Sequence, residues 1–452
     1  MSDAEEIIIK NVKLIKKLAK KETTGLVWFG NDLRVQDNEV LAKGVEFHNK
    51  IMCVYFIDPK LFEKNQFGFK KMNVFRTQFL LESLKDLRQQ LIKKNISLLI
   101  YLDKPENRIE KICNTYQIKS IYKQKEWTFE EINCKKAVEE TLSKDVKIEE
   151  IYNQFLYHPD DINMDIQNIP QVFSNLRKKL EKYVSIQPQV YIPKLSPQNL
   201  INETTDIPTL KEVGFEILNQ ESKTAFPFKG GETEALKRLN NYFFETKKLE
   251  FYKKTRNGLL GTDYSSKFSP WLANGSISAR TIYWNVKKFE LEETKNQSTY
   301  WLIFELIWRD YFKYISIKHG NNIFKIRGIL DKDYEWSSSK RLIQQWIDGE
   351  TKDDFVNANM IELKKTGWMS NRGRQNVASY FSKELKLDWR VGAAYFESML
   401  LDYDVHSNYG NWMYVSGVGN DPRDRKFNTK LQAERYDTNG EFRRVWLQPR
   451  LF

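Results

Sequence analysis

The stretch GLVWFGNDLRVQDN, residues 25–38, passes from a short apolar run into a cluster of polar side chains. Further apolar runs of strand length follow at 51–57, 96–102, 120–124 and 148–152. Residues 73–94 repeat apolar side chains at helical spacing. Strands that alternate with helices favour a parallel sheet covered on both faces. We therefore expect a five-stranded, Rossmann-like α/β domain over residues 25–158. The polar cluster follows its first strand, at the sheet edge where ligands and partner domains meet.

The rest of the chain changes character twice. Residues 159–230 carry seven prolines and few periodic runs, which indicates a long connector over the surface. From 231 to 452 helical periodicity dominates, so we expect a second, all-α domain. Its helices are expected at 232–244, 280–289, 298–317, 340–347, 376–385 and 391–401. Residues 1–24 form a lysine-rich N-terminal extension, which we interpret as a solvated helix.

Size and composition bound the function. At 452 residues the chain is too long for one compact core, which agrees with two domains. A net charge of +12 and a pI of about 9.2 favour a polyanionic partner such as nucleic acid. The three cysteines lack metal-ligand spacing, so we expect no metal site and a reducing compartment. The sequence shows no secretory signal and no apolar run of membrane length, so we expect a cytoplasmic protein without membrane contact.

Two polar stretches in the second half look like the walls of one cofactor site. LDYDVHSNYGNWMYVSGVGNDPRDRKF, residues 401–427, places acids and amides around one tryptophan, and GWMSNRGRQNVASY, residues 367–380, is similarly polar. Buried polar groups cost free energy unless they are paired. A polar and planar partner is therefore expected for this part of the chain.

Six motifs in a fixed order carry a resemblance to a known family. They are FGNDLRVQDN (29–38), FPFKGGETEALKRL (226–239), YSSKFSPWLANGSIS (264–278), ELIWRDYFKY (305–314), TGWMSNRGRQNVASYF (366–381) and LDYDVHSNYGNWMYVSGVGNDPRDRKFN (401–428). In these motifs the chain resembles the photolyase/cryptochrome family, and within it the DASH-type cryptochromes. The resemblance implies an α/β antenna domain, an all-α FAD-binding domain and light-driven electron transfer to cyclobutane pyrimidine dimers.

The third motif supplies the expected phosphate site of FAD. Small hydroxyls and free backbone N–H groups at a helix start suit a pyrophosphate, although ordinary helix capping is the alternative. The residues are Ser265, Ser266, Lys267, Phe268 and Ser269. The resemblance also implies that Tyr252 lies against the cofactor.

The flavin ring is expected between the two polar stretches. The resemblance implies an ion pair of Arg374 and Asp402 across the ring, and the alternative is a structural salt bridge without a ligand. Asn408 matches the residue that faces the flavin N5, and an amide there favours cycling through fully reduced flavin. Asp404 is a weaker candidate, on proximity alone.

Three tryptophans match the family's route for electrons from the surface to the flavin. Trp412 would be proximal, Trp389 central and Trp336 distal. Without the resemblance, tryptophans so far apart in the sequence would indicate core packing. The route would serve reduction of the flavin by light and is separate from repair.

The expected substrate site combines Glu305 and Trp308, which share one face of a helix, with Asn371. Trp308 could stack on a flipped base and Glu305 could bind pyrimidine edges, whereas the alternative is a packed helix face. Six-four photolyases carry histidine where this chain has Asn371, which argues against that lesion. Tyr414 replaces a second tryptophan, and this smaller platform predicts a preference for dimers in single-stranded DNA. Arg423, Arg425 and Lys426 either contact phosphates or form a solvated loop.

An antenna pigment is expected in the N-terminal domain. The segment KEWTFEE, residues 125–131, resembles the stretch with which DASH proteins hold methenyltetrahydrofolate, and Glu126 is the candidate residue. Trp127 departs from the smaller residue expected there. A deazaflavin or an empty site are the alternatives.

The leading hypothesis is a monomeric, light-dependent deoxyribodipyrimidine lyase. The runner-up is a signalling photoreceptor, against which Asn408 counts because plant photoreceptor cryptochromes carry an acid there. The third reading is a flavoprotein that binds DNA, or RNA, without repairing it.

Overall fold

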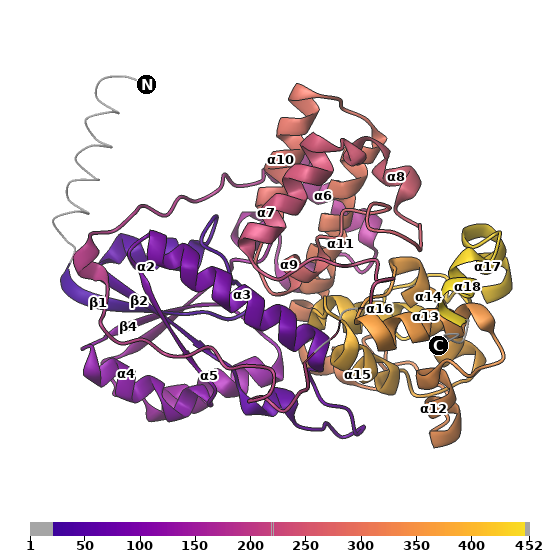
Figure 1. The fold of residues 1–452 in the computed structure, drawn as a ribbon, viewed down its shortest axis with the longest axis horizontal. Helices are drawn as coiled ribbons and strands as arrows, with labels where there is room; N and C mark the ends of the chain where they lie inside the picture. Colours follow the sequence, from indigo (N-terminus) through magenta and orange to yellow (C-terminus); the bar gives the residue numbers. More distant parts are fainter. Residues whose placement is uncertain (1–20, 218, 220, 448–452) are drawn as a thin grey trace.

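The computed structural model describes residues 21–217, 219 and 221–447. Most of the N-terminal extension, residues 1–20, lies outside the described residues. Within them, the N-terminal part is built on a five-stranded parallel sheet in the order β3-β2-β1-β4-β5 (Figure 1). The strands are β1 Lys21–Trp28, β2 His48–Phe56, β3 Ser97–Tyr101, β4 Ser120–Gln124 and β5 Lys147–Ile151. The predicted sheet is therefore confirmed.

Helices cover both faces of this sheet. Successive residues of β1 point to opposite faces, so Val27 packs in one core cluster while Leu26 packs in the other. Helices α2 (Glu39–Phe47) and α3 (Val74–Lys93) bury the first face, and α4 (Ile109–Thr115) and α5 (Phe129–Thr141) bury the second. Each side of the sheet thus has its own hydrophobic core.

The prediction of a surface connector over residues 159–230 is partly wrong. It contains helix α6 (Phe173–Tyr183), which buries Phe173, Leu176 and Leu180 in the largest hydrophobic cluster of the helical part. These three residues follow helical spacing, but the surrounding prolines obscured it. The chain therefore inserts one helix into the second domain before the expected boundary at 231.

The second domain is all-α, as predicted. Its helices are α7 Glu232–Asn240, α8 Tyr252–Thr255, α9 Ser269–Ala273, α10 Ala279–Glu292, α11 Gln297–His319, α12 Lys340–Asp348, α13 Asp354–Thr366, α14 Asn371–Ser379, α15 Trp389–Met399, α16 Val405–Ser416, α17 Thr429–Tyr436 and α18 Glu441–Leu447. The sequence did not predict α8, α13, α16, α17 or α18. Helix α16 lies inside the polar stretch and is nevertheless buried in the core with α15.

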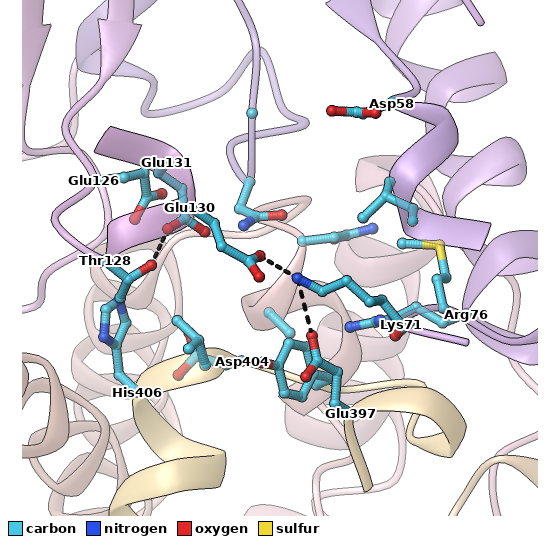
Figure 2. Close-up of a pocket in the computed structure, with 18 of the residues that line it drawn as sticks. Asp58, Lys71, Arg76, Glu126, Thr128, Glu130, Glu131, Glu397, Asp404 and His406 are labelled. Atoms are coloured by element: carbon cyan, nitrogen blue, oxygen red, sulfur yellow. Dashed lines mark hydrogen bonds and ion pairs between the residues drawn. The ribbon is translucent and has the colours of Figure 1, made fainter. Parts of the chain in front are cut away.

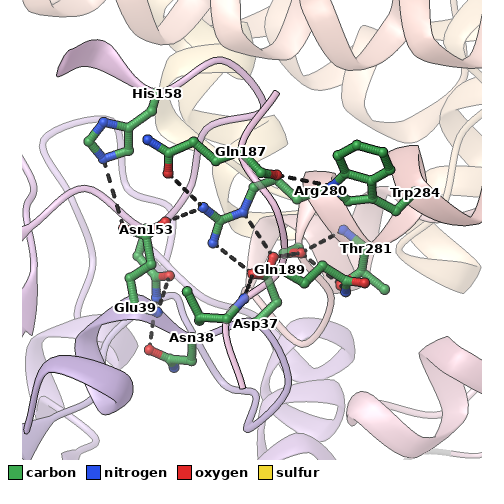
Figure 3. Close-up of polar contacts among 12 residues, drawn as sticks. Asp37, Asn38, Glu39, Asn153, His158, Gln187, Gln189, Arg280, Thr281 and Trp284 are labelled. Carbon is green, nitrogen blue, oxygen red and sulfur yellow. Dashed lines mark hydrogen bonds and ion pairs between the residues drawn. The ribbon is translucent and has the colours of Figure 1, made fainter. Parts of the chain in front are cut away.

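The polar cluster after β1 binds the other domain. Arg280 places Nη2 2.7 Å from Oδ1 of the fully buried Asp37, and Ser278 donates to the same carboxylate (Figure 3). Arg34 donates to the carbonyl oxygen of Gly275 at 3.1 Å. These contacts identify the other domain as one of the partners expected at this sheet edge.

Candidate functional site

Arg374 and Asp402 form the ion pair that the sequence predicted. Nη2 of Arg374 lies 2.9 Å from Oδ1 and 3.0 Å from Oδ2 of Asp402. Nε of Arg374 donates to the carbonyl oxygen of Met369 at 3.0 Å, which fixes the guanidinium plane. The Asp402 side chain is 3% exposed and that of Arg374 is 24% exposed. The carboxylate is therefore desolvated and depends on this one cation.

The loop before α9 is shaped to receive an anion. Lys267 adopts a left-handed φ of +65°, and Phe268 follows with right-handed angles of −74° and −13°. Alternating conformations of this kind turn successive backbone N–H groups toward one point and create an anion-binding nest. Within the described ranges, no side chain caps α9, so ordinary capping does not explain the serines. The helix has only five residues, so the nest matters more than the helix dipole.

Several buried polar groups nearby fit a polar cofactor. Among the residues that the structure describes, Nζ of Lys267, Oε2 of Glu362 and Nε1 of Trp412 have no hydrogen-bond partner. Nζ of Lys267 lies 3.2 Å from the ring centroid of Tyr264, and burial lowers the pKa of this lysine well below its usual value. Lys267 and Glu362 are electrostatic neighbours. Unsatisfied buried groups are costly, so this pair fits a polar cofactor such as FAD, which offers phosphates and ring acceptors.

Glu362 was missed in the sequence. It lies on α13, is 1% exposed, and burial raises its pKa to about 8. The cations of Lys267 and Arg374 counteract this rise. No motif marks a lone acid on a helix that was itself not predicted, so the sequence carried no usable signal for it.

Asp404 and Asn408 lie one turn apart at the start of α16, and their side chains have different partners. Asn408 is buried, and its amide nitrogen donates to the carbonyl oxygen of Ala393 at 3.0 Å. Asp404 caps the helix through the N–H of Ser407 and pairs with Nζ of Lys313 at 2.9 Å. Burial alone would raise the pKa of Asp404, but the nearby ammonium lowers it overall. Asp404 lines the cavity between the domains, away from the Arg374 pair.

The three tryptophans of the expected electron route lie in one region. Trp412 and Trp389 are buried, whereas Trp336 is half-buried. Gly392, one turn after Trp389, packs so closely on Trp412 that an added β carbon would lie 2.2 Å from Cη2 of its ring. The residue after Trp336 pairs with the chain just before Trp389, where Asp388 donates its N–H to Ser337 at 3.2 Å. The indole of Trp336 is thus the most exposed of the three.

The expected substrate residues surround an aromatic corner. Trp308 stacks on Phe173, with ring centroids 3.7 Å apart, and meets Tyr414 edge to face at 6.2 Å. Glu305 lies on the same helix, and its Oε1 is 2.9 Å from Nη2 of Arg256, a partner that the sequence did not predict. Burial raises the pKa of Glu305, and the guanidinium counteracts this.

Tyr252 lies near Glu305, whereas Asn371 lies at the start of α14. Tyr252 is buried and is an electrostatic neighbour of Glu305, which connects the expected cofactor and substrate residues. Asn371 is exposed at the start of α14, one turn before Arg374. The position of Tyr252 brings the expected cofactor site next to the aromatic corner.

The basic cluster beyond α16 is largely neutralised. Arg425 contacts the Asp421 carboxylate and donates to the hydroxyl of Tyr414 at 2.6 Å. Lys426 pairs with Glu384. Of the three cations, Arg423 therefore stays the better candidate for a phosphate contact.

The cavity between the domains, which Asp404 lines, has a volume of about 590 Å³, and Glu126 lines it as well (Figure 2). Burial raises the pKa of Glu126 to about 7, although Lys313 counteracts this. The neighbouring Gln124 donates to Glu126 at 2.6 Å, and its own Oε1 lacks a partner among the described residues. Lys71 pairs with Glu130 from its own domain and lies 3.7 Å from Glu397 of the other.

His406 lines this cavity and stacks on Trp127. Their rings stack with centroids 4.5 Å apart, and Nδ1 of His406 shares a hydrogen bond with Oγ of Ser316 at 2.7 Å. Burial lowers the pKa of His406 well below its usual value, so its imidazole is neutral. The departure at Trp127 is explained by the same stack.

Both ends of the chain match known protein families. Residues 25–195 match the family described as DNA photolyase, and residues 301–451 match the FAD binding domain of DNA photolyase. A cryptochrome DASH of Arabidopsis thaliana, described as chloroplastic/mitochondrial, is 42% identical over 450 residues, covering 98% of this chain and 78% of that protein. The chain belongs to the DASH cryptochromes. Like the rest of the family, it is an FAD-binding protein of the photolyase type.

Solved structures of this family share the architecture. A cryptochrome from Synechocystis sp. superposes with a TM-score of 0.90 at 42% identity, covering 94% of this chain and 88% of the other. A class III photolyase from Agrobacterium tumefaciens shares the fold, with a TM-score of 0.80 at 23% identity over 94% of this chain and 87% of the other. In the described part of this DASH cryptochrome, no helix is long and apolar enough to span a membrane. The cytoplasmic location and the monomeric state stay predictions.

Proposed function

We propose that this DASH cryptochrome repairs cyclobutane pyrimidine dimers under blue light. The observation that carries the proposal is the corner of Trp308 and Tyr414, because Tyr414 lies on the same helix as Asn408 and Trp412. FAD held by these residues would supply the light-driven electron transfer that splits the dimer. The protein contributes binding, orientation and electrostatics.

Each residue then has a defined task. Trp308 supplies a flat surface for an extruded base, and its own ring is held rigid by Phe173. Glu305, oriented by Arg256, accepts hydrogen bonds from pyrimidine edges, and Asn371 donates from the exposed start of α14. For the cofactor, Arg374 and Asp402 hold the ring, Asn408 faces it, and the loop around Lys267 takes the phosphates.

The preference for single strands follows from Tyr414. Extruding a dimer from a duplex costs unstacking and unpairing energy, and this cost is smaller in a single strand. A phenol offers less stacking area than an indole, and the hydroxyl of Tyr414 is held at 2.6 Å by Arg425, so the ring cannot swing to compensate. We therefore propose that duplex dimers are poor substrates.

The proposal is tested with purified, FAD-loaded and reduced protein under blue light. Trp308→Ala should weaken binding of a dimer-containing oligonucleotide about 5- to 150-fold, since base–aromatic stacking contributes about 1–3 kcal/mol. Trp284→Ala is the matched control, because Trp284 is a partly exposed indole on α10 that donates to Gln187. Equal binding by both variants would remove Trp308 from the substrate site. No restored thymine with the unaltered protein would end the repair proposal.

We also propose that the cavity beside Glu126 holds a methenyltetrahydrofolate antenna. Its volume suits a small ligand, and Glu126 with the unpartnered oxygen of Gln124 offers acceptors for the donors of a pterin. Protein purified after folate loading should show a near-ultraviolet band beside the flavin bands. Glu126→Gln should lose this band, whereas Glu110→Gln, at an exposed site on α4, should keep it. Retention of the band by Glu126→Gln would exclude Glu126 from the site.

A further inference from the structure

The guanidinium of Arg238, on α7, bonds mainly to the loop before α9. Nε donates to the carbonyl oxygen of Ser266, and Nη2 donates to those of Thr262 and Ser265, each at 3.2 Å. Nη1 donates to Oδ1 of Asp263 at 2.9 Å and to Oδ1 of Asn241 at 3.4 Å. All five N–H donors of the side chain are therefore used.

The surroundings of Arg238 hold it in one position. The side chain is 3% exposed, and its guanidinium carbon lies 4.9 Å from the ring of Phe228 and 4.7 Å from that of Tyr242. The carboxylate of Asp263 balances its charge. Neither α7 nor this arginine belongs to the loop itself, so the contact ties the loop to a rigid helix.

The peptide planes transmit this contact to the far side of the loop. In a trans peptide, the carbonyl of one residue and the N–H of the next point in opposite directions. When Arg238 attracts the carbonyls of Ser265 and Ser266, the N–H groups of Ser266 and Lys267 are directed away from it. Within the described residues, these two N–H groups have no acceptor. They join the nest formed at Lys267 and Phe268.

We propose that Arg238 is a positioning residue for the phosphates of the dinucleotide cofactor. It does not touch the cofactor; it orients the backbone donors that do. Lysine could not replace it, because a single ammonium cannot span three carbonyls that the planar fork of arginine reaches together. The inference rests on the proposed role of residues 265–269 as the phosphate loop of FAD.

The test compares two flavins that differ in the phosphates. FAD and riboflavin share the isoalloxazine ring, but only FAD carries a pyrophosphate. Affinities for both are measured by quenching of flavin fluorescence on the FAD-free full chain, for Arg238→Met, for Arg238→Lys and for the control Lys237→Met. Lys237 is the neighbouring cation, with a side chain 74% exposed. Thermal unfolding of each FAD-free variant is followed in parallel.

Arg238→Met and Arg238→Lys should each bind FAD at least about tenfold more weakly, because several hydrogen bonds to a charged group are lost. Their affinity for riboflavin should change less than about threefold, and Lys237→Met should match the unaltered protein for both ligands. Equal losses for FAD and riboflavin, or unchanged FAD affinity, would overturn the positioning role. If Arg238→Met fails to fold, Arg238→Lys decides the question. An unaltered protein that does not prefer FAD over riboflavin would refute the phosphate loop itself.

Discussion

Replacing Arg374 with methionine isolates the ion pair at the flavin site. The change deprives Asp402 of contacts at 2.9 Å and 3.0 Å and leaves a carboxylate whose side chain is 3% exposed. It also removes the donor to Met369. Removing one partner of a buried pair typically costs 3–5 kcal/mol. Because the Arg374 side chain is 24% exposed, we expect the low end, about 3 kcal/mol of unfolding free energy.

The assay is denaturant unfolding of the FAD-free protein, combined with measurement of bound flavin. The double variant Arg374→Met/Asp402→Leu removes the stranded charge as well, so most of the lost stability should return. FAD binding should not return, because the pair is proposed to hold the cofactor ring. A single variant that loses less than about 1 kcal/mol would refute the energetic reasoning. A double variant that binds FAD normally would reduce the pair to a structural salt bridge.

Three further predictions follow from buried groups near the cofactor. Trp412→Phe should abolish photoreduction of bound FAD by an external donor, and unchanged kinetics would remove Trp412 from the route. Gly392→Ala should displace that indole, destabilise the protein by about 1–3 kcal/mol and slow photoreduction; an unperturbed rate would contradict the packing argument. Glu362 has a folded-state pKa of about 8 against an ordinary 4.5, so stability of the FAD-free protein should fall as pH rises from about 4.5 to 8, by up to about 1.4 kcal/mol per pH unit. Glu362→Gln should remove that slope, and parallel stability curves for both proteins would contradict it.

The sheet and the helices with clear apolar spacing could be predicted because burial imposes a period on the sequence. Helix α16 escaped, since its buried polar residues satisfy one another across the fold: His406 bonds to Ser316, and Asn408 bonds to the backbone of Ala393. Such pairs break the apolar pattern without exposing the helix. Helix α6 escaped for a different reason, because flanking prolines obscure its apolar spacing.

The sequence predicted those residues of the candidate site that lie within short motifs. The motifs located Arg374 and Asp402, which the structure joins in an ion pair, whereas the electron route through the three tryptophans stays a prediction. Asp404 is two residues from Asp402, but α16 begins between Asp404 and Asn408 and turns its carboxylate toward Lys313. Contacts from distant elements, such as Arg256 with Glu305, depend on the packing of whole helices and leave no local signal.

The most direct test measures light-driven repair by the fully reduced protein. The substrate is one dimer-containing oligonucleotide, used once as a single strand and once annealed to its complement. We expect blue light to restore thymines in the single strand and to do so markedly more slowly in the duplex, while dark controls stay unchanged. Absence of restored thymine in both substrates, with FAD bound and reduced, would contradict the repair function. Faster repair of the duplex would contradict the role given to Tyr414.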